Sequence, residues 1–391
     1  MVEISSNSLY YQHMKVYFDN AATTIVRDEA IDLMVTIMKE KYGNPSSTHY
    51  MGRQAACMRE LARKNVAAVI SAAPENIYFT SGGTEANNWA VLGLAEISSR
   101  KGRHIITSQI EHSAVIEPIK KLESLGWEVT YLSPDSSGRI SPDSFSSALR
   151  KDTAFVSIMM VNNETGAINP ITEYTDEIKR RKLSTLLHTD AVQGFCKIPI
   201  SVKSLGADLI AISAHKMHGP KGVGALYIRS GTNLPHSQLG GGQENGKRPG
   251  TEGLPAIVGF GEAARLSLLE QNETSHTVKK LREYMIHKLQ KEIPKALLIG
   301  ECGSPFLLSI SLPGHKSEVL MSFLDAEGIC VSKSSACKKG ARSRVLEAMK
   351  LKNNIIDGAL RISFSKYNTI TEADYFIKTL KRASETLFKS L

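Results

Sequence analysis

The sequence has few cysteines and none of the spacings that build a disulfide framework or a zinc site. The five cysteines are Cys57, Cys196, Cys302, Cys330 and Cys337. Their number is odd, they lie far apart, and no C-x-x-C pair occurs among them, which favours free thiols in a reducing compartment. We therefore expect no metal site.

Long apolar runs are also missing. Nowhere do 18 uncharged apolar residues follow one another, and the N-terminus, MVEISSNSLYYQHMKVYFD, has no basic region followed by an apolar one. A transmembrane helix and a secretory signal peptide both need such runs. The sequence therefore predicts a cytoplasmic protein that does not act in a membrane.

Aromatic residues make up only 6% of the chain, and its basic residues are spread out. Lysine and arginine number 48 against 39 acidic residues, a net charge of +9, yet no helix presents a continuous basic stripe. This pattern argues against direct binding of nucleic acid, whereas the excess charge suits an anionic cofactor or an acidic partner.

Short apolar runs alternate with helical patterns between residues 50 and 230, which predicts an α/β fold: a mostly parallel sheet with helices on both faces. The expected strands are Ile77 to Thr80, His104 to Thr107, Val129 to Leu132, Phe155 to Val161, Thr185 to His188, Leu209 to Ser213 and Ala225 to Ile228. The expected helices between them are Arg53 to Ile70, Glu85 to Ser98, Ala114 to Leu125 and Thr172 to Arg181.

After Gly253 the pattern becomes α+β. The expected helices are Ala263 to Glu270, His276 to Ile293, a segment near Glu318 to Glu327 and a terminal helix from Glu372 to about Leu387, and the expected strands are Leu307 to Leu312, Ile329 to Ser332 and Leu360 to Phe364. A chain of 391 residues is long enough for two domains. We predict a large domain over residues 16–260 and a smaller α+β domain over residues 261–391. Residues 1–15 are expected to form an N-terminal extension that packs with the small domain.

A lysine stands at the end of one apolar strand, in the stretch DLIAISAHKMHGPKGVGALYI from Asp208 to Ile228. Lys216 follows the strand where burial lowers the pKa of an amine, and a neutral amine can form a Schiff base. Ser213 and His215 precede it, where they can hold an anionic group such as a phosphate. A second turn, Ser81-Gly82-Gly83-Thr84, joins a strand to a helix and can also cradle a phosphate, although alone it is equally an ordinary helix cap.

Further polar residues follow other strands at their carboxyl ends, where open α/β sheets bind ligands. Asp190 is costly to bury without a positive partner, and a pyridinium nitrogen can be that partner; an N-cap role is the alternative. His112 can stack on a planar ring, and Asn163 offers an amide. Arg361, set in an apolar strand, needs an anion, either a substrate carboxylate or an internal ion pair.

The loop SKSSACKKG, residues 332–340, carries Cys337 among small residues and three lysines. Nearby cations lower the pKa of a thiol below its ordinary value of about 8.5, which favours the reactive thiolate. Cys57, Cys196 and Cys330 have apolar or helical neighbours, which is typical of structural cysteines. Cys337 does not fit that pattern.

These residues together resemble the cysteine desulfurases of the iron-sulfur-assembly type, which are fold-type I pyridoxal phosphate enzymes. The resemblance runs from about Val16 to the terminal helix. The motifs that carry it are YFDNAATT, YGNPSSTH, TSGGTEANN, EHSAV, NNETG, HTDAVQ, SAHKMHGPKG, GGGQENGKRPGT and SSAC, followed by the late arginine.

The resemblance implies that Lys216 carries pyridoxal 5'-phosphate and removes the substrate's α-proton, with His112 stacked on the ring. It implies that Asp190 faces the pyridine nitrogen and that Gln193 lies near the phenolic oxygen of the ring. Phosphate contacts are implied for Gly83, Thr84, Ser213, His215 and, across a homodimer interface, Thr251. Asn163 and Arg361 are implied to bind the substrate carboxylate.

The implied reaction converts L-cysteine to L-alanine and leaves a persulfide on Cys337 for a sulfur-acceptor protein, such as an iron-sulfur scaffold or a thiolation enzyme. The Cys337 loop is shorter and more basic than is usual in the family, which leaves the acceptor open. A selenocysteine lyase or another C–S lyase is an alternative, and a weakly catalytic sulfur-carrier or partner-binding protein is another.

Overall fold

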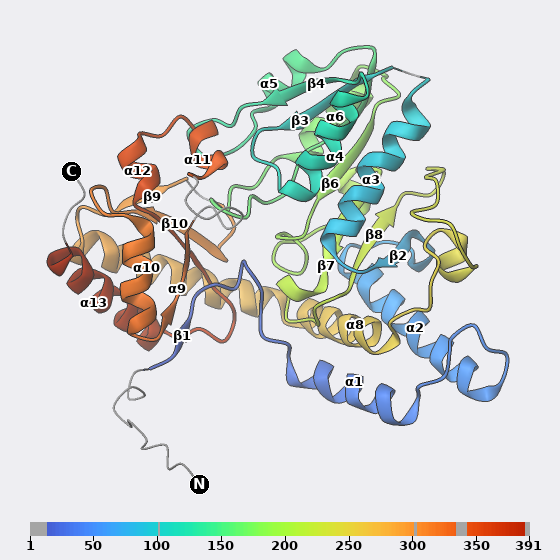
Figure 1. Cartoon of the computed structure of the whole chain (residues 1–391), viewed down its shortest axis with the longest axis horizontal. Helices are drawn as coiled ribbons and strands as arrows, with labels where there is room; N and C mark the ends of the chain where they lie inside the picture. Colours follow the sequence, from blue (N-terminus) through green and yellow to red (C-terminus); the bar gives the residue numbers. More distant parts are fainter. Residues whose placement is uncertain (1–13, 101, 301–302, 334–341, 388–391) are drawn as a thin grey trace, which may run out of the picture.

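The computed structural model describes residues 14–100, 102–300, 303–333 and 342–387 of the chain (Figure 1). Cys302, Cys337 and the predicted extension up to residue 13 lie outside these residues. In the part of the chain that is described, no helix is long and apolar enough to cross a membrane. The same residues include no group of three or more His, Cys, Asp or Glu side chains that could hold a metal ion.

A seven-stranded sheet forms the centre of the larger part of the molecule. Its strands, in order across the sheet, are β2 (Ile77–Thr80), β8 (Gly224–Ile228), β7 (Leu209–Ser213), β6 (Leu186–Asp190), β5 (Thr153–Ser157), β3 (His104–Ser108) and β4 (Glu128–Leu132). The strands from β7 to β4 are parallel, whereas β8 is antiparallel to both of its neighbours. The predicted α/β fold with a mostly parallel sheet is confirmed.

Alternating residues of the strands pack into two hydrophobic cores, one on each face of the sheet. In β7, Leu209 and Ala211 join the core that contains α3 and α4, while Ile210 and Ile212 join the core on the opposite face. Side chains alternate between the faces of a strand, so a strand that is apolar throughout must be covered on both sides. This explains why the sequence shows continuous apolar runs.

Eight helices of the described chain pack around this sheet, and the first, fifth and seventh of them are not among those expected from the sequence. They are α1 (Asp28–Glu40), α2 (Tyr50–Val69), α3 (Gly83–Ser98), α4 (Ser113–Ser124), α5 (Pro142–Ala148), α6 (Ile171–Arg180), α7 (Val202–Leu205) and α8 (Leu254–Leu269). The strand predicted to continue to Val161 ends at Ser157 instead. Beyond it the chain turns at Asn162, and Val161 pairs with Ile168 in an isolated bridge.

A four-stranded antiparallel sheet forms a second part, in the order β12 (Ser332–Lys333), β13 (Ala359–Ser363), β10 (Leu307–Ser311) and β9 (Leu297–Ile299). The helices α9 (Gln271–Glu292), α10 (Ser317–Ala326) and α13 (Ile370–Thr386) pack around it, and α11 (Arg344–Ala348) and α12 (Asn353–Asp357) follow β12 in the chain. The strand β1 (Val16–Tyr17) pairs in parallel with β11 (Ile329–Cys330), so the start of the described chain lies beside late elements (Figure 1).

The residues that pack on the large sheet and those that pack on the smaller sheet are not separated at one point of the chain. The predicted boundary near residue 260 falls inside α8, and Ala263 and Ala264 beyond it belong to a core of the large sheet, as do Val345 and Leu346 of α11. The early residues Val16 and Phe18 instead join the core of the smaller sheet. The division into residues 16–260 and 261–391 therefore stays a prediction.

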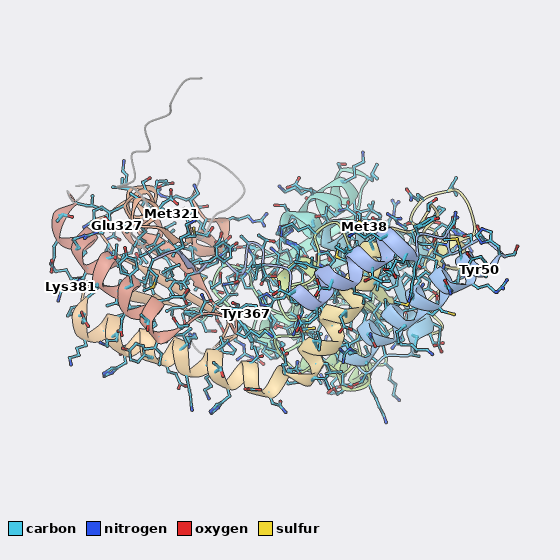
Figure 2. The ribbon with its side chains drawn as sticks, turned by 90° about the horizontal axis from the view of Figure 1, so that it is seen from below. Met38, Tyr50, Met321, Glu327, Tyr367 and Lys381 are labelled. Carbon is cyan, nitrogen blue, oxygen red and sulfur yellow. The ribbon has the colours of Figure 1, made fainter. Side chains whose placement is uncertain are left out.

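The molecule is elongated, with the smaller sheet and its helices at one end (Figure 2). Tyr367, just beyond β13, lies between the two parts, where its ring packs edge-on against His218 with the centroids 5.1 Å apart. Glu270 adds a polar link, because it binds both Arg27 at 2.9 Å and Lys366 at 2.7 Å. These contacts hold the two parts together beside the carboxyl ends of the parallel strands.

Candidate active site

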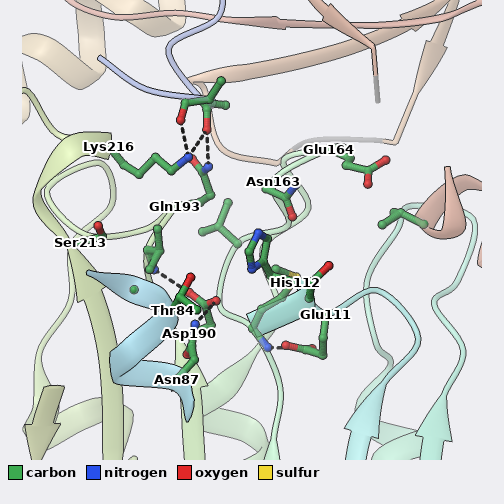
Figure 3. Close-up of a pocket in the computed structure, with 18 of the residues that line it drawn as sticks. Thr84, Asn87, Glu111, His112, Asn163, Glu164, Asp190, Gln193, Ser213 and Lys216 are labelled. Atoms are coloured by element: carbon green, nitrogen blue, oxygen red, sulfur yellow. Dashed lines mark hydrogen bonds between the residues drawn. The ribbon is translucent and has the colours of Figure 1, made fainter. Parts of the chain in front are cut away.

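A cavity of about 590 Å³ opens at the carboxyl ends of β5, β6 and β7, which is the edge where open α/β sheets bind ligands. Ten of the residues singled out from the sequence line it (Figure 3): Gly83, Thr84, His112, Asn163, Asp190, Gln193, Ser213, His215, Lys216 and Arg361. Thr251 is exposed and is not among the lining residues. The structure thus brings together residues from both sheets.

Lys216 ends the short 3-10 helix Ala214–Lys216, directly after β7. Its Nζ donates hydrogen bonds to the carbonyl oxygens of Ala21, at 2.8 Å, and Ala22, at 2.6 Å. These carbonyls orient the lysine toward the cavity (Figure 3). Sequence reasoning missed both alanines, since a backbone acceptor almost 200 residues away carries no side-chain signal.

Asp190 is the last residue of β6 and is buried at the base of the cavity. Its Oδ2 accepts a hydrogen bond from Asn87 Nδ2 at 2.8 Å, and its Oδ1 accepts one from the backbone N–H of Val192 at 2.9 Å. Burial raises the pKa of the Asp190 carboxyl, against the opposing influence of these hydrogen bonds and of His112. A buried carboxylate of this kind is stabilised by a cationic ligand.

His112 caps the N-terminus of α4, where its Nδ1 accepts a hydrogen bond from the backbone N–H of Ala114 at 3.1 Å. Burial lowers the pKa of the imidazole, so the neutral form is favoured. Because Nδ1 acts as an acceptor, the proton of the neutral ring lies on Nε2. A neutral ring beside a planar ligand can both stack on it and exchange a proton.

The turn before α3 forms a cradle at one side of the cavity. The helix begins at Gly83, and its first N–H groups point out of the helix end, which suits an anion. A side chain at Gly83 would clash, because its Cβ would lie 2.8 Å from Val192 Cγ2. Ser213 and His215 line the same cavity, and burial together with the charge of Lys216 lowers the pKa of His215 to about 4.

Arg361 lies in β13 and is 2% exposed. Its Nη2 donates to Asp19 Oδ1 at 2.9 Å and its Nη1 to the carbonyl oxygen of Asn163, also at 2.9 Å, while its Nε has no partner among the described residues. The internal ion pair that the sequence left open is therefore present. Arg361 lines the cavity, and Nη1 and Nη2 each carry a second N–H, so this guanidinium is still able to bind an anion there.

The chain matches known proteins over almost its whole length. Residues 16–376 match the model of the aminotransferase class-V family. A cysteine desulfurase IscS from Dictyoglomus turgidum is 44% identical over 377 residues, 95% of each chain, and one from Methanosarcina thermophila is 42% identical over 380 residues, 96% of this chain and 93% of that one. A solved NifS-like protein superimposes with a TM-score of 0.90 at 41% identity, covering 96% of this chain and all of the other.

The chain belongs to the cysteine desulfurases of the aminotransferase class-V family. Its cofactor is pyridoxal 5'-phosphate. The residues on the cavity wall fit that group: a lysine beside β7, the buried carboxylate of Asp190, which forms no ion pair with another described residue, and a cradle that a Cβ at Gly83 would fill. The fit rests on the donors and the shape of this site.

Two buried carboxyl groups of this desulfurase lie in motifs quoted from the sequence, but no role was assigned to them there. Burial raises the pKa of Glu111 to about 8 and that of Glu164 to about 7. Glu111 Oε1 accepts hydrogen bonds from Ser108 Oγ and from the backbone N–H of Met159, whereas its Oε2 has no described partner. Glu164 Oε2 accepts a hydrogen bond from Ser343 Oγ. Both are sequence neighbours of predicted site residues, His112 and Asn163, and this position could have indicated them.

Cys337, the predicted sulfur carrier of the desulfurase, lies outside the described residues. The chain on both sides of it is held at the cavity. Before it, Ser332 of β12 pairs with Arg361 of β13. After it, Arg342 and Arg344 line the cavity, and Arg344 donates to the carbonyl oxygen of Glu111. The segment that carries the cysteine therefore starts and ends beside the cavity.

Proposed function

We propose that this desulfurase removes sulfur from L-cysteine, releases L-alanine and holds the sulfur as a persulfide on Cys337. The anchoring of residues 332 and 344 beside the cavity supports the assignment, because it fixes both ends of the segment that carries the thiol. In this reaction the substrate C–S bond breaks, a new S–S bond forms to Cys337, and the substrate β-carbon gains a proton. No external oxidant is needed, because the two electrons that the sulfur atoms lose on forming the S–S bond remain on the substrate β-carbon.

Each step has a residue in the cavity that suits it. Arg361, which lines the cavity, binds the substrate carboxylate through its guanidinium, with Asn163 beside it. Lys216, positioned by two carbonyl oxygens, takes the α-proton, and His112 exchanges a proton through Nε2. The bound pyridoxal phosphate supplies an electron sink for the charge that develops at the α-carbon.

The cofactor contacts are proposed on the same basis. Lys216 holds the cofactor covalently, Asp190 faces its ring nitrogen, and Gln193 lies near its phenolic oxygen. Gly83, Thr84, Ser213 and His215 receive its phosphate, and His112 stacks on the ring. Burial of the Asp190 carboxyl and the open cradle at Gly83 carry this assignment.

We further propose a homodimer in which Thr251 of one subunit reaches the phosphate site of the other. Large apolar side chains are exposed on the part of the molecule away from α13, among them Met38 at 54% and Tyr50 at 65% (Figure 2), and Leu239 is 93% exposed. Burying such side chains is favourable, by about 25 cal/mol for each Å² removed from water. The sulfur acceptor is proposed to be an iron-sulfur scaffold or a thiolation enzyme, and the cytoplasmic location stays a prediction.

Mass spectrometry of the intact protein after turnover with cysteine tests the persulfide. We expect the mass of added sulfur on Cys337, and loss of sulfide release in Cys337→Ser with the visible absorption of the cofactor unchanged. Cys57→Ser and Cys330→Ser, at the two exposed thiols that the structure describes, are the matched controls. Added sulfur on another cysteine would contradict the assignment, and a C337S variant that still acts on selenocysteine would indicate a lyase. A protein that binds no pyridoxal phosphate would leave only a partner-binding role.

A further inference from the structure

Lys197 is a buried cation without a carboxylate partner. Its side chain is almost completely buried, and its Nζ donates to Gln193 Oε1 at 3.0 Å. Within the described residues it forms no ion pair. Glu270 is the one carboxylate among those residues that lines the same small cavity, and Arg27 and Lys366 already bind its oxygens. A charge buried in this way costs free energy that a packing role does not explain.

The backbone at this position is also unusual. Lys197 ends a tight turn in which its own N–H bonds to the carbonyl oxygen of Gly194, and Cys196 before it has a φ of +61°. A cysteine rarely adopts this left-handed conformation, and such residues cluster at functional sites. Two unfavourable features thus coincide at one turn.

A short chain of hydrogen bonds connects Lys197 to Lys216. Gln193 uses its Oε1 to accept from Lys197, so its Nε2 faces Ala21, whose carbonyl oxygen it contacts at 2.9 Å. The same carbonyl oxygen accepts from Lys216 Nζ at 2.8 Å (Figure 3). Because an ammonium can only donate, Lys197 permits one orientation of the Gln193 amide.

The charges around Lys197 are mostly positive. The titratable and charged groups that face it or share its cavity are Cys196, His215, Lys216, His218, Arg361, Arg27, Glu270 and Lys366. Burial, with smaller contributions from Lys216 and Arg361, lowers the pKa of Lys197 to about 7. Repulsion between two cations acts on both, so a protonated Lys197 also disfavours a proton on Lys216.

We propose that Lys197 is a positioning residue of this active site, which fixes the amide of Gln193 and, through its charge, favours the neutral amine of Lys216. This inference rests on the proposed role of Lys216 in holding the cofactor and moving the α-proton. It adds a residue that touches neither the substrate nor the sulfur.

The test compares Lys197→Met with Lys203→Met, the same substitution at an exposed lysine six residues later in the chain. The visible absorption of the cofactor-loaded protein is titrated with pH, because it reports the proton on the nitrogen of Lys216. We expect the midpoint to rise by about one pH unit in K197M, where a nearby cation is lost, and to stay unchanged in K203M. We also expect kcat/KM for cysteine to fall about tenfold in K197M.

Stability gives a readout without the cofactor. A buried lysine with a lowered pKa destabilises the folded protein most when it is charged, so the contribution of Lys197 to the stability of the parent apoprotein should rise between pH 7 and 9. K197M lacks this contribution, so its Tm should equal or exceed that of the parent at pH 7, and the difference should change toward pH 9 in favour of the parent.

Equal midpoints in K197M and the parent would overturn the proposal, as would a loss of Tm at all pH values with an unshifted midpoint. Should K197M not fold, Lys197→Arg keeps the cation and must keep the parent's midpoint; a shift there counts against the proposal. If the parent binds the cofactor but releases no alanine, the proposed function fails, while a shifted midpoint in K197M would still support Lys197.

Discussion

Glu111 is a buried acid whose charge changes within the working pH range of an enzyme. Its pKa is raised to about 8 by burial, so the folded protein holds a proton there that the unfolded chain loses above about pH 4.5. The contribution of Glu111 to the free energy of unfolding therefore falls as pH rises from about 5 to 8. We expect Glu111→Gln, which is neutral throughout, to match the parent at pH 5 and to exceed it by about 1 to 3 kcal/mol at pH 8.5.

Denaturant unfolding of the apoprotein at the two pH values measures this difference. Glu96→Gln, at an exposed acid of α3, is the control and should show no such dependence. A variant E111Q that is equally less stable at both pH values would contradict a protonated Glu111.

The glycine at the start of α3 gives a second prediction for a single residue. Gly83→Ala places a Cβ 2.8 Å from Val192 Cγ2, so either the turn must move or the new methyl group occupies part of the cradle. We expect the affinity for pyridoxal phosphate to fall at least about tenfold, with the fold retained. Equilibrium dialysis or absorption titration of the apoprotein measures the affinity.

The double variant Gly83→Ala with Val192→Ala tests the reason for that loss. Removing the methyl groups of Val192 frees the space that the new Cβ needs, so part of the affinity should return. Val192→Ala alone serves as the control. An unchanged affinity in G83A would show that the cradle is wider than the contact distance indicates.

Ser343 connects the helix α11 to Glu164, which lies 179 residues earlier in the chain. Ser343 Oγ accepts from the backbone N–H of Leu346 at the N-terminus of α11 and donates to Glu164. Ser343→Ala should cost about 1 to 3 kcal/mol, because it removes a helix cap and leaves a buried carboxyl without its donor. It should also slow persulfide formation, because α11 directly follows the segment that carries Cys337.

Ser141→Ala is the matched control, since Ser141 caps α5 and its oxygen accepts from Ser144 N–H at 3.1 Å. It should cost about 1 kcal/mol without changing the rate of sulfur transfer. Chemical denaturation gives the stability, and single-turnover alanine release gives the rate. Equal effects of S343A and S141A on that rate would contradict an anchoring role for α11.

Sequence patterns predict an element well here when the residues of that element alone determine it. The strands Ile77–Thr80 and Leu209–Ser213 were predicted to the residue, because each is an apolar run ended by a Gly or Ser turn. The strand expected from Ile329 to Ser332 is instead two strands, β11 on β1 and β12 on β13. A single sequence does not say which partner a short strand will pair with.

The same reasoning explains which parts of the site were predictable. Residues that follow strands, such as Asp190 and Lys216, could be found because parallel strands deliver their carboxyl ends to one edge. Asn87 and the carbonyl oxygen of Ala21 could not, since their role depends on contacts between distant segments. Neither could the missing counter-ion of Lys197, which only the packed neighbours reveal.

At the scale of the whole molecule, the placement of Thr251 outside the cavity of its own chain leads to a prediction about mixed dimers. If Thr251 serves the other subunit, a dimer of one Lys216→Ala chain and one Thr251→Ala chain contains one complete site. We expect each variant alone to be impaired, K216A completely, and the mixed dimer to have about half of the parent's activity, so that an equimolar mixture regains about a quarter after random subunit exchange.

Steady-state sulfide release before and after mixing measures this recovery. A mixture of K216A with Cys337→Ser is a second comparison. The lesions of these two variants need not combine as those of K216A and Thr251→Ala do, so the comparison distinguishes the role of Thr251 from that of Cys337. Activity that remains at the sum of the separate variants, despite exchanged subunits shown by native mass spectrometry, would place Thr251 outside the partner's site.

The pairing of the two ends of the described chain has a consequence for its synthesis. Asn20 Nδ2 donates to the carbonyl oxygen of Ser363, 343 residues later, and the N–H of Ala21, the residue that positions Lys216, donates to Ser363 Oγ. On the ribosome the central sheet can assemble while the early strand waits for β11 and β13 to emerge. A nascent or prematurely terminated chain therefore has a sheet without a working active site, and no partial product can release sulfur before translation is nearly complete.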